Sequence, residues 1–470
     1  MTSAFIQRAN NTPLTLQYTP SRYPTNDEPD VQVDEELQGI LSTIRPHVGR
    51  ILSVDIQLGL CDTANAFCEL LEQESWPNLE FLRIILECEC TPNPTVHLFN
   101  NLLLRRETIL RVEPQNLRYL ELYGIDLVPP GRITWHNTDL NSFSHFRFLS
   151  LHEVSIKTFG ILMMVLVLLE LCPGLEHFCL QTSDIYHRDS EPALPELESR
   201  MMVRLPSMQS LRLVMPWWSD LNYLLARLAI PESAQVFLDT DGHGHYHEAN
   251  PLSCAYLLRS INPTQRYLDT ASCIRICRNG LESITLSAYR GDPADDAPPC
   301  MQLQTRFFIN VDVTPWGHTT LYNGGVAWRS SGLKILELEF SMWHLRDMPL
   351  NTLATILSNT PHLTIFRQRH SPLRHTTGDP DYAPPISRLY ELDFTKWHIP
   401  FLEALVVLPH TSVPALVPDL CTLEFDDLDQ VTLSDELSEA MRQCLDTRRA
   451  VVPSFHILIS GSPWTYEARA

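Results

Sequence analysis

Three histidines alternate with other residues in the stretch 239–250, DTDGHGHYHEAN. Neutral imidazoles beside a carboxylate suit zinc, so His243, His245 and His247 are candidate ligands of a metal-dependent hydrolase. The flanking DTDG and EANP predict turns, and Gly242 and Gly244 add backbone freedom. A metal site needs a rigid frame and supporting partners, so these neighbours favour a solvated surface loop. We therefore expect neither a catalytic residue nor a bound metal or other cofactor.

Motifs that would mark other chemistry do not occur in the sequence. There is no Gly-x-Ser-x-Gly elbow, Walker loop, His-Glu-x-x-His or Gly-x-Gly-x-x-Gly. The stretch YNGGVAW at 322–328 contains a glycine pair but lacks the lysine of a phosphate loop, which favours a hairpin turn. Scattered acidic residues and histidines do not define a geometry. The sequence predicts a binding protein rather than an enzyme.

Composition limits the choice of partner and compartment. The chain of 470 residues carries a formal net charge of −21, which disfavours nucleic acids and anionic membrane surfaces. The 12 cysteines form no Cys-x-x-Cys pair, and the first residues show no basic stretch before an apolar run. The apolar run ILMMVLVLLEL at 161–171 has about half the length of a membrane span. We expect a cytoplasmic or nuclear protein that binds another protein.

A repeated pattern must position any functional residues. It reads leucine, two residues, leucine, one residue, leucine, as in PNLEFLRI, QNLRYLEL, PGLEHFCL and SGLKILEL. The first positions of its copies are Leu79, Leu117, Phe146, Leu175, Met208, Leu281, Leu333, Leu363, Leu389 and Leu420. Helical stretches are predicted at 64–74, 159–172, 220–228, 264–278, 350–359 and 400–408. One strand and one helix about every thirty residues predict a repeat array, because a single unit buries no core of its own.

This pattern resembles leucine-rich-repeat proteins, and in particular the fungal F-box/leucine-rich-repeat group. The stretches TPLTLQYTP, ELQGILSTIRPHVGRILSVDIQL and LLELCPGLEHFCL carry the resemblance. It implies an α/β fold, an irregular solenoid with a curved parallel sheet on its concave face and helices and loops on its convex face. We expect a non-repeat cap at 1–75 and the array at 76–470, with insertions near 239–252 and 290–330. The resemblance also implies a ubiquitin-ligase adaptor that recognises substrates.

Two departures from the family leave an alternative open. No copy has the asparagine or cysteine that usually ties neighbouring repeats together at the ninth position. No F-box segment is visible before the array, so docking to a ligase is unsupported. The alternative is a freestanding leucine-rich-repeat scaffold unrelated to ubiquitin.

Alternation along a strand assigns the third, fifth and seventh positions of each copy to the concave face. These positions are rich in aromatic side chains in the early copies and in carboxylates in the late copies. The predicted partner-binding residues are Phe81, Tyr119, Tyr123, Phe148, His152, Glu337, Glu339, Glu391, Asp393, Glu424 and Asp426. We expect apolar or aromatic anchors of a protein partner on the first group, and its Lys and Arg side chains on the second.

Overall fold

The computed structural model divides the chain into two compact units, Met1–Ala234 (unit 1) and Gln235–Ala470 (unit 2). Both combine helices with mostly parallel strands, which confirms the α/β class. The structure describes residues 12–19, 31–58, 67, 70–71, 74–86, 116–124, 145–155, 159–183, 202–216, 218–241, 267, 269–279, 283–291, 298–306, 332–340, 357–358, 360–370, 395–406, 417–426, 433–460 and 462–464.

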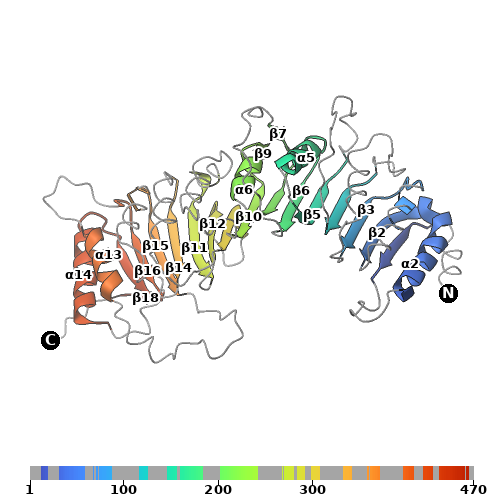
Figure 1. Cartoon of the computed structure of the whole chain (residues 1–470). Coiled ribbons are helices and arrows are strands. Elements are labelled where there is room, and N and C mark those ends of the chain that lie inside the picture. Colours follow the sequence, from blue (N-terminus) through green and yellow to red (C-terminus); the bar gives the residue numbers. More distant parts are fainter. Residues whose placement is uncertain are drawn as a thin grey trace. The chain divides into compact units, whose positions relative to one another are not determined.

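The strands of unit 1 run parallel and follow one another in chain order (Figure 1). Their order is β1-β2-β3-β4-β5-β6-β8, and β7 pairs separately with β9. Their bounds are β1 Leu14–Tyr18, β2 Ile51–Leu58, β3 Phe81–Leu86, β4 Tyr119–Tyr123, β5 Phe148–Ser155, β6 His177–Ser183, β7 Val203–Arg204, β8 Ser210–Val214 and β9 Leu228–Ala229.

The helices of unit 1 precede strands in the chain, as the sequence predicts for two of them. Helix α5 (Phe159–Glu170) is apolar on all sides, a pattern typical of a buried helix, and its described core-facing residues are buried. It ends just before Pro173 and Gly174, which cannot extend it. The other helical elements are α2 (Val31–Ile44), the 3-10 helix η1 (Arg45–Arg50) and α6 (Trp218–Leu225).

Unit 2 interrupts the parallel pattern with an antiparallel section. Its strand order is β10-β13-β12-β11-β14-β15-β16-β17-β18, in which β12 runs antiparallel to both β11 and β13, and β18 runs antiparallel to β17. All other described pairs in this unit are parallel. The bounds are β10 Gln235–Asp241, β11 Cys273–Asn279, β12 Ser283–Tyr289, β13 Met301–Arg306, β14 Ile335–Phe340, β15 Ile365–His370, β16 Thr422–Phe425, β17 His456–Ile459 and β18 Ser462–Pro463.

Two helices lie side by side near the last strands of unit 2, α13 (Thr395–Leu405) and α14 (Asp435–Arg449) (Figure 1). Ser434 caps α14 by accepting the N–H of Leu437, and the acidic first turn and basic last turn complement the helix dipole. The guanidinium of Arg448, 0% exposed, donates to the carbonyls of Leu405 and Val417. Arg448 therefore ties α14 to the end of α13.

A repeated backbone contact sets the spacing of the strands. The acceptor is the carbonyl of the residue just before one strand. The two donors are consecutive N–H groups at the start of the neighbouring strand: that of the residue just before it and that of its first residue. Arg118, for example, accepts from Arg147 and Phe148, and Lys334 accepts from Thr364 and Ile365. The same contact recurs at Glu80, Arg147, Glu176, Ser272 and Thr364. Asn78 and Asn116 add side-chain hydrogen bonds to carbonyls of the preceding turn, those of Gly49 and Pro77.

The structure corrects two features of the predicted array. The helix predicted at 264–278 is wrong over its second half, which forms β11. The parallel sheet is also interrupted, because the copy beginning at Leu281 forms the antiparallel strand β12. The cap boundary near residue 75 stays a prediction, although β2 of that segment pairs directly with β3. Most of the predicted insertions at 239–252 and 290–330 lies outside the described residues.

Candidate functional site

In unit 1, the two faces of the strands differ in chemistry. Alternate positions such as Leu120 and Leu122 are buried in the core, as the repeat pattern predicts. The opposite face carries residues that lie in register from strand to strand. One such set is the aromatic row, which we define as Phe81, Tyr119, Phe148 and His177 on β3, β4, β5 and β6.

The rings of the aromatic row stack on one another and remain half-buried. The centroids of Phe81 and Tyr119 are 4.2 Å apart with an interplanar angle of 15°, and those of Tyr119 and Phe148 are 4.0 Å apart at 9°. Phe148 and His177 are 6.0 Å apart and tilted by 41°. Because each inner ring covers its neighbours' faces, the row presents mainly ring edges to its surroundings.

The next row along the strands centres on the buried carboxylate of Glu121. The hydroxyl of Tyr119 donates to Glu121 Oε2 at 2.5 Å, and Arg83 Nε lies 3.4 Å from the same oxygen. Arg83 Nη1 also lies 3.6 Å from Asp55 Oδ2, so one arginine is shared by two carboxylates. Burial, followed by the hydrogen bond to Glu121, raises the pKa of Tyr119, so this phenol stays protonated as a donor.

A third row contains Tyr123 and His152, whose rings stack with centroids 4.0 Å apart. Ser150 Oγ lies 2.6 Å from His152 Nε2, and His152 Nδ1 lies 3.3 Å from Gln181 Oε1. This geometry resembles a hydroxyl nucleophile with its base and an orienting group. Ser150 is only 1% exposed, however, so a substrate has no access to its hydroxyl. The contacts of His152 with Ser150 and Gln181 link β5 to β6.

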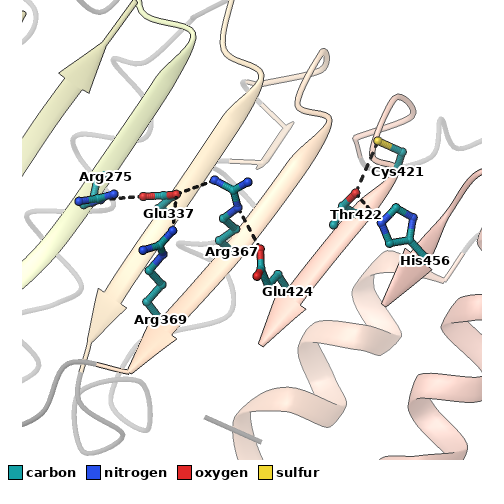
Figure 2. Close-up of polar contacts among 8 residues, drawn as sticks. All are labelled: Arg275, Glu337, Arg367, Arg369, Cys421, Thr422, Glu424 and His456. Atoms are coloured by element: carbon teal, nitrogen blue, oxygen red, sulfur yellow. Dashed lines mark hydrogen bonds and ion pairs between the residues drawn. The ribbon is translucent and has the colours of Figure 1, made fainter. Parts of the chain in front are cut away.

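In unit 2, the equivalent face carries alternating charges. Arg275, Glu337, Arg367 and Glu424 lie in register on the adjacent strands β11, β14, β15 and β16, and we call them the charge ladder. Glu337 accepts from Arg275 Nε at 2.6 Å and from Arg367 Nη1 at 2.9 Å, while Arg367 Nε donates to Glu424 at 2.9 Å. Arg369 approaches Glu337 at 3.5 Å (Figure 2).

The charge ladder overturns the expectation of an uncompensated acidic surface at Glu337. This side chain is 0% exposed and contacts three guanidinium groups. Burial alone raises the pKa of its carboxyl, but the hydrogen bonds from Arg367 and Arg275 outweigh that effect and bring the pKa below its ordinary value. Glu337 is therefore ionised and already paired, so it has no site left for a partner's basic side chain.

The other predicted acidic residues are distributed differently. Glu339 Oε2 accepts from the Cys277 thiol at 3.0 Å, and the half-buried Asp426 bonds through its backbone N–H to the carbonyl of Gln368. Glu391 and Asp393 lie outside the described residues. The strands on either side of that segment in the chain, β15 and β16, pair directly with each other.

The arginines that neutralise the carboxylates were missed in the sequence. Arg367 and Arg369 occupy the fifth and seventh positions of the copy that begins at Leu363, so applying the repeat pattern to this weak copy would have found them. Arg275 belongs to no copy of the pattern. The sequence signal that could have found it is its place between Ile274 and Ile276, because a polar residue between two apolar ones is typical of a strand.

A smaller polar cluster lies beside the charge ladder on β16 and β17 (Figure 2). His456 Nδ1 lies 2.9 Å from the carbonyl of Ser454, which can only accept, so Nδ1 carries the proton. His456 Nε2 lies 3.2 Å from the Thr422 hydroxyl. Thr422 Oγ1 is also 3.8 Å from Cys421 Sγ. The Thr422 hydroxyl is buried, so the cluster stabilises the pairing of the two strands.

The predicted metal ligands His243, His245 and His247 lie outside the described residues. Among the residues that the structure does describe, no group of three His, Cys, Asp or Glu side chains is placed to hold a metal ion. No helix in the described ranges is long and apolar enough to cross a membrane. No model of a known protein family matches the sequence, and no curated protein sequence matches it either.

Proposed function

We propose that the chain is an irregular leucine-rich-repeat solenoid that binds a protein partner through the aromatic row. Three observations support the solenoid. The strands of unit 1 pair in chain order, the copies whose side chains the structure describes bury the same positions, and one backbone contact recurs from strand to strand. A stack of such units buries a continuous core that one unit lacks.

The aromatic row carries the proposal for binding. The core of unit 1 is already filled by the alternate leucines, so the core does not require rings on the opposite face. Phe81, Tyr119 and Phe148 nevertheless stand together there, half-buried and held in position by stacking. Rigid aromatic side chains give a large contact area at a small entropic cost, and they are enriched at the centres of protein interfaces.

The proposal covers binding and does not extend to ubiquitin transfer or catalysis. No contact among the described residues bears on docking to a ligase, which is the part of the F-box resemblance that the sequence leaves unsupported. In unit 2, the compensated charge ladder removes the reason for expecting a basic partner at Glu337.

A comparison of three purified chains by quantitative pull-down from host extract tests the proposal. The chains are the wild type, Phe148→Ala and the matched control Met202→Ser, which removes an apolar side chain that is 55% exposed elsewhere in unit 1. We expect a partner that the wild type and the control retain and Phe148→Ala loses by about ten-fold, as for an interface hot spot. Titration of the purified partner must reproduce this loss. Equal retention by all three folded chains would refute binding through the aromatic row.

A further inference from the structure

The aromatic row has an end at which rings give way to small hydroxyl side chains. Ser53 on β2 lies in register with Phe81, and Thr15 on β1 lies in register with Ser53. Ser53 is half-buried and Thr15 is exposed. Tyr119 covers one face of the Phe81 ring, and the other face points towards Ser53. β2 would carry the next ring of the stack, but its residue in register is Ser53, whose side chain is too short to stack on Phe81.

A carboxylate stands beside Ser53. Asp55 is the next residue after Ser53 on that face of β2, and it lies in register with Arg83 on β3. Its side chain is 29% exposed, and Arg83 lies 3.6 Å away, longer than a direct hydrogen bond. The residues around Ser53 thus offer an aromatic ring, two hydroxyl groups and a carboxylate.

We propose that an arginine of the protein partner occupies the place above Ser53, with its guanidinium stacked on Phe81 and paired with Asp55. A guanidinium is flat, so it extends a stack whose rings are 4.0 and 4.2 Å apart. It is cationic, so it suits both the face of an aromatic ring and a carboxylate. Lysine carries the same charge but has no plane to stack. The net charge of −21 favours the approach of a basic segment.

The opposite end of the aromatic row also has a serine in register, but the charged residue beside it is an arginine. Ser210 on β8 lies in register with His177, and the next residue on that face of β8 is Arg212. Arg212 takes the position there that Asp55 has beside Ser53, so this position offers a partner's arginine no carboxylate. Ser210 therefore offers a matched control, because Ser210→Arg and Ser53→Arg make the same chemical change at the two ends of one row.

The test is a selection of random peptides of about twelve residues, long enough to cross the row at ~3.3 Å per residue, on the immobilised full chain. We expect enrichment of arginine over lysine. Replacing the enriched arginine by citrulline, its neutral isostere, should weaken binding about ten-fold, equivalent to about 1.4 kcal/mol. Ser53→Arg should give a similar loss, and Ser210→Arg should give less than about two-fold. Asp55→Asn is a second variant, and thermal unfolding checks that each chain is folded.

The inference rests on the proposed function, but the two fail differently. Suppose the selected peptides lack arginine, bind Ser53→Arg normally and bind Phe148→Ala more weakly than the wild type. This result overturns the arginine site but still supports binding through the aromatic row. Peptides that respond to neither Ser53→Arg nor Phe148→Ala overturn both proposals, as does the selection of no peptide at all. Loss of arginine peptides on Ser53→Arg and on Asp55→Asn, with retention on Ser210→Arg, supports the arginine site.

Discussion

Replacing Glu337 by glutamine should destabilise unit 2 strongly, because Glu337 holds the charge ladder together. The glutamine keeps the size of the side chain but leaves three arginines near one another without the central negative charge. Breaking a buried ion pair costs about 3–5 kcal/mol, and the lower value applies because Arg275 and Arg367 are themselves 18% exposed. For a unit of this size, about 3 kcal/mol lowers the midpoint of thermal unfolding by about 6–12 °C.

Calorimetry of the full chain measures this change, with Glu424→Gln as the control. Glu424 pairs with Arg367 alone in the ladder and is 21% exposed, so its loss should cost less than about 1 kcal/mol. Equal shifts for the two variants would show that the central position of Glu337 has no special weight.

Acid should remove the difference between the wild type and Glu337→Gln. Because the pKa of Glu337 is lower in the folded state than its ordinary 4.5, the unfolded chain binds this proton first. The stabilisation is therefore present above pH 4.5 and is lost as the pH falls through the folded-state pKa. The free energies of unfolding of the two proteins, measured in urea at decreasing pH, should converge, and a constant difference would contradict the assignment.

Three further predictions concern α14. Ser434→Ala removes the helix cap and should lower the free energy of unfolding in urea by about 1 kcal/mol, whereas an unchanged value would deny the cap a role. Arg448→Met leaves the buried carbonyls of Leu405 and Val417 without donors and should cost about 2–4 kcal/mol in the same assay, and a cost below about 1 kcal/mol would contradict this. Burial raises the pKa of Cys444 to about 12, so iodoacetamide at neutral pH should label this thiol only after unfolding. Peptide mapping of the labelled chain would expose a reactive native thiol.

The positions of many strands could be predicted because the repeat pattern records burial directly. A leucine at the fourth and sixth positions, such as Leu149 and Leu151, is completely buried, and β5 lies where the pattern places it. The apolar run at 161–171 likewise located α5. Sequence reasoning failed at β11, where the run CIRICRN follows a stretch of helical spacing. The alternation of apolar and polar residues that favours a strand is short here, and the helical spacing before it is longer. The segment forms a strand because it pairs with β12 and β14, which the sequence alone does not show.

The chemistry of the faces was less predictable than their positions. The pattern assigned Glu337 to the face of its strand opposite Leu336 and Leu338, and these two leucines are buried in the core. It could not say that Glu337 is fully buried, because that depends on which side chains stand on the neighbouring strands. Arg275 comes from a strand more than sixty positions earlier in the sequence, and only the three-dimensional pairing brings it beside Glu337. Charge compensation between strands is a property of register rather than of composition.

The alternating signs of the charge ladder also restrict how this part of the chain can change in length. Neighbouring strands are about 4.8 Å apart, so side chains in register are always close. Deleting β14 alone would place Arg275 beside Arg367, and adding one charged strand beside it would create a pair of like charges on one side or the other. Removing β14 and β15 together would instead bring Arg275 next to Glu424 and restore an attractive pair. Strands that carry a charge in this row can therefore be gained or lost without electrostatic repulsion only two at a time.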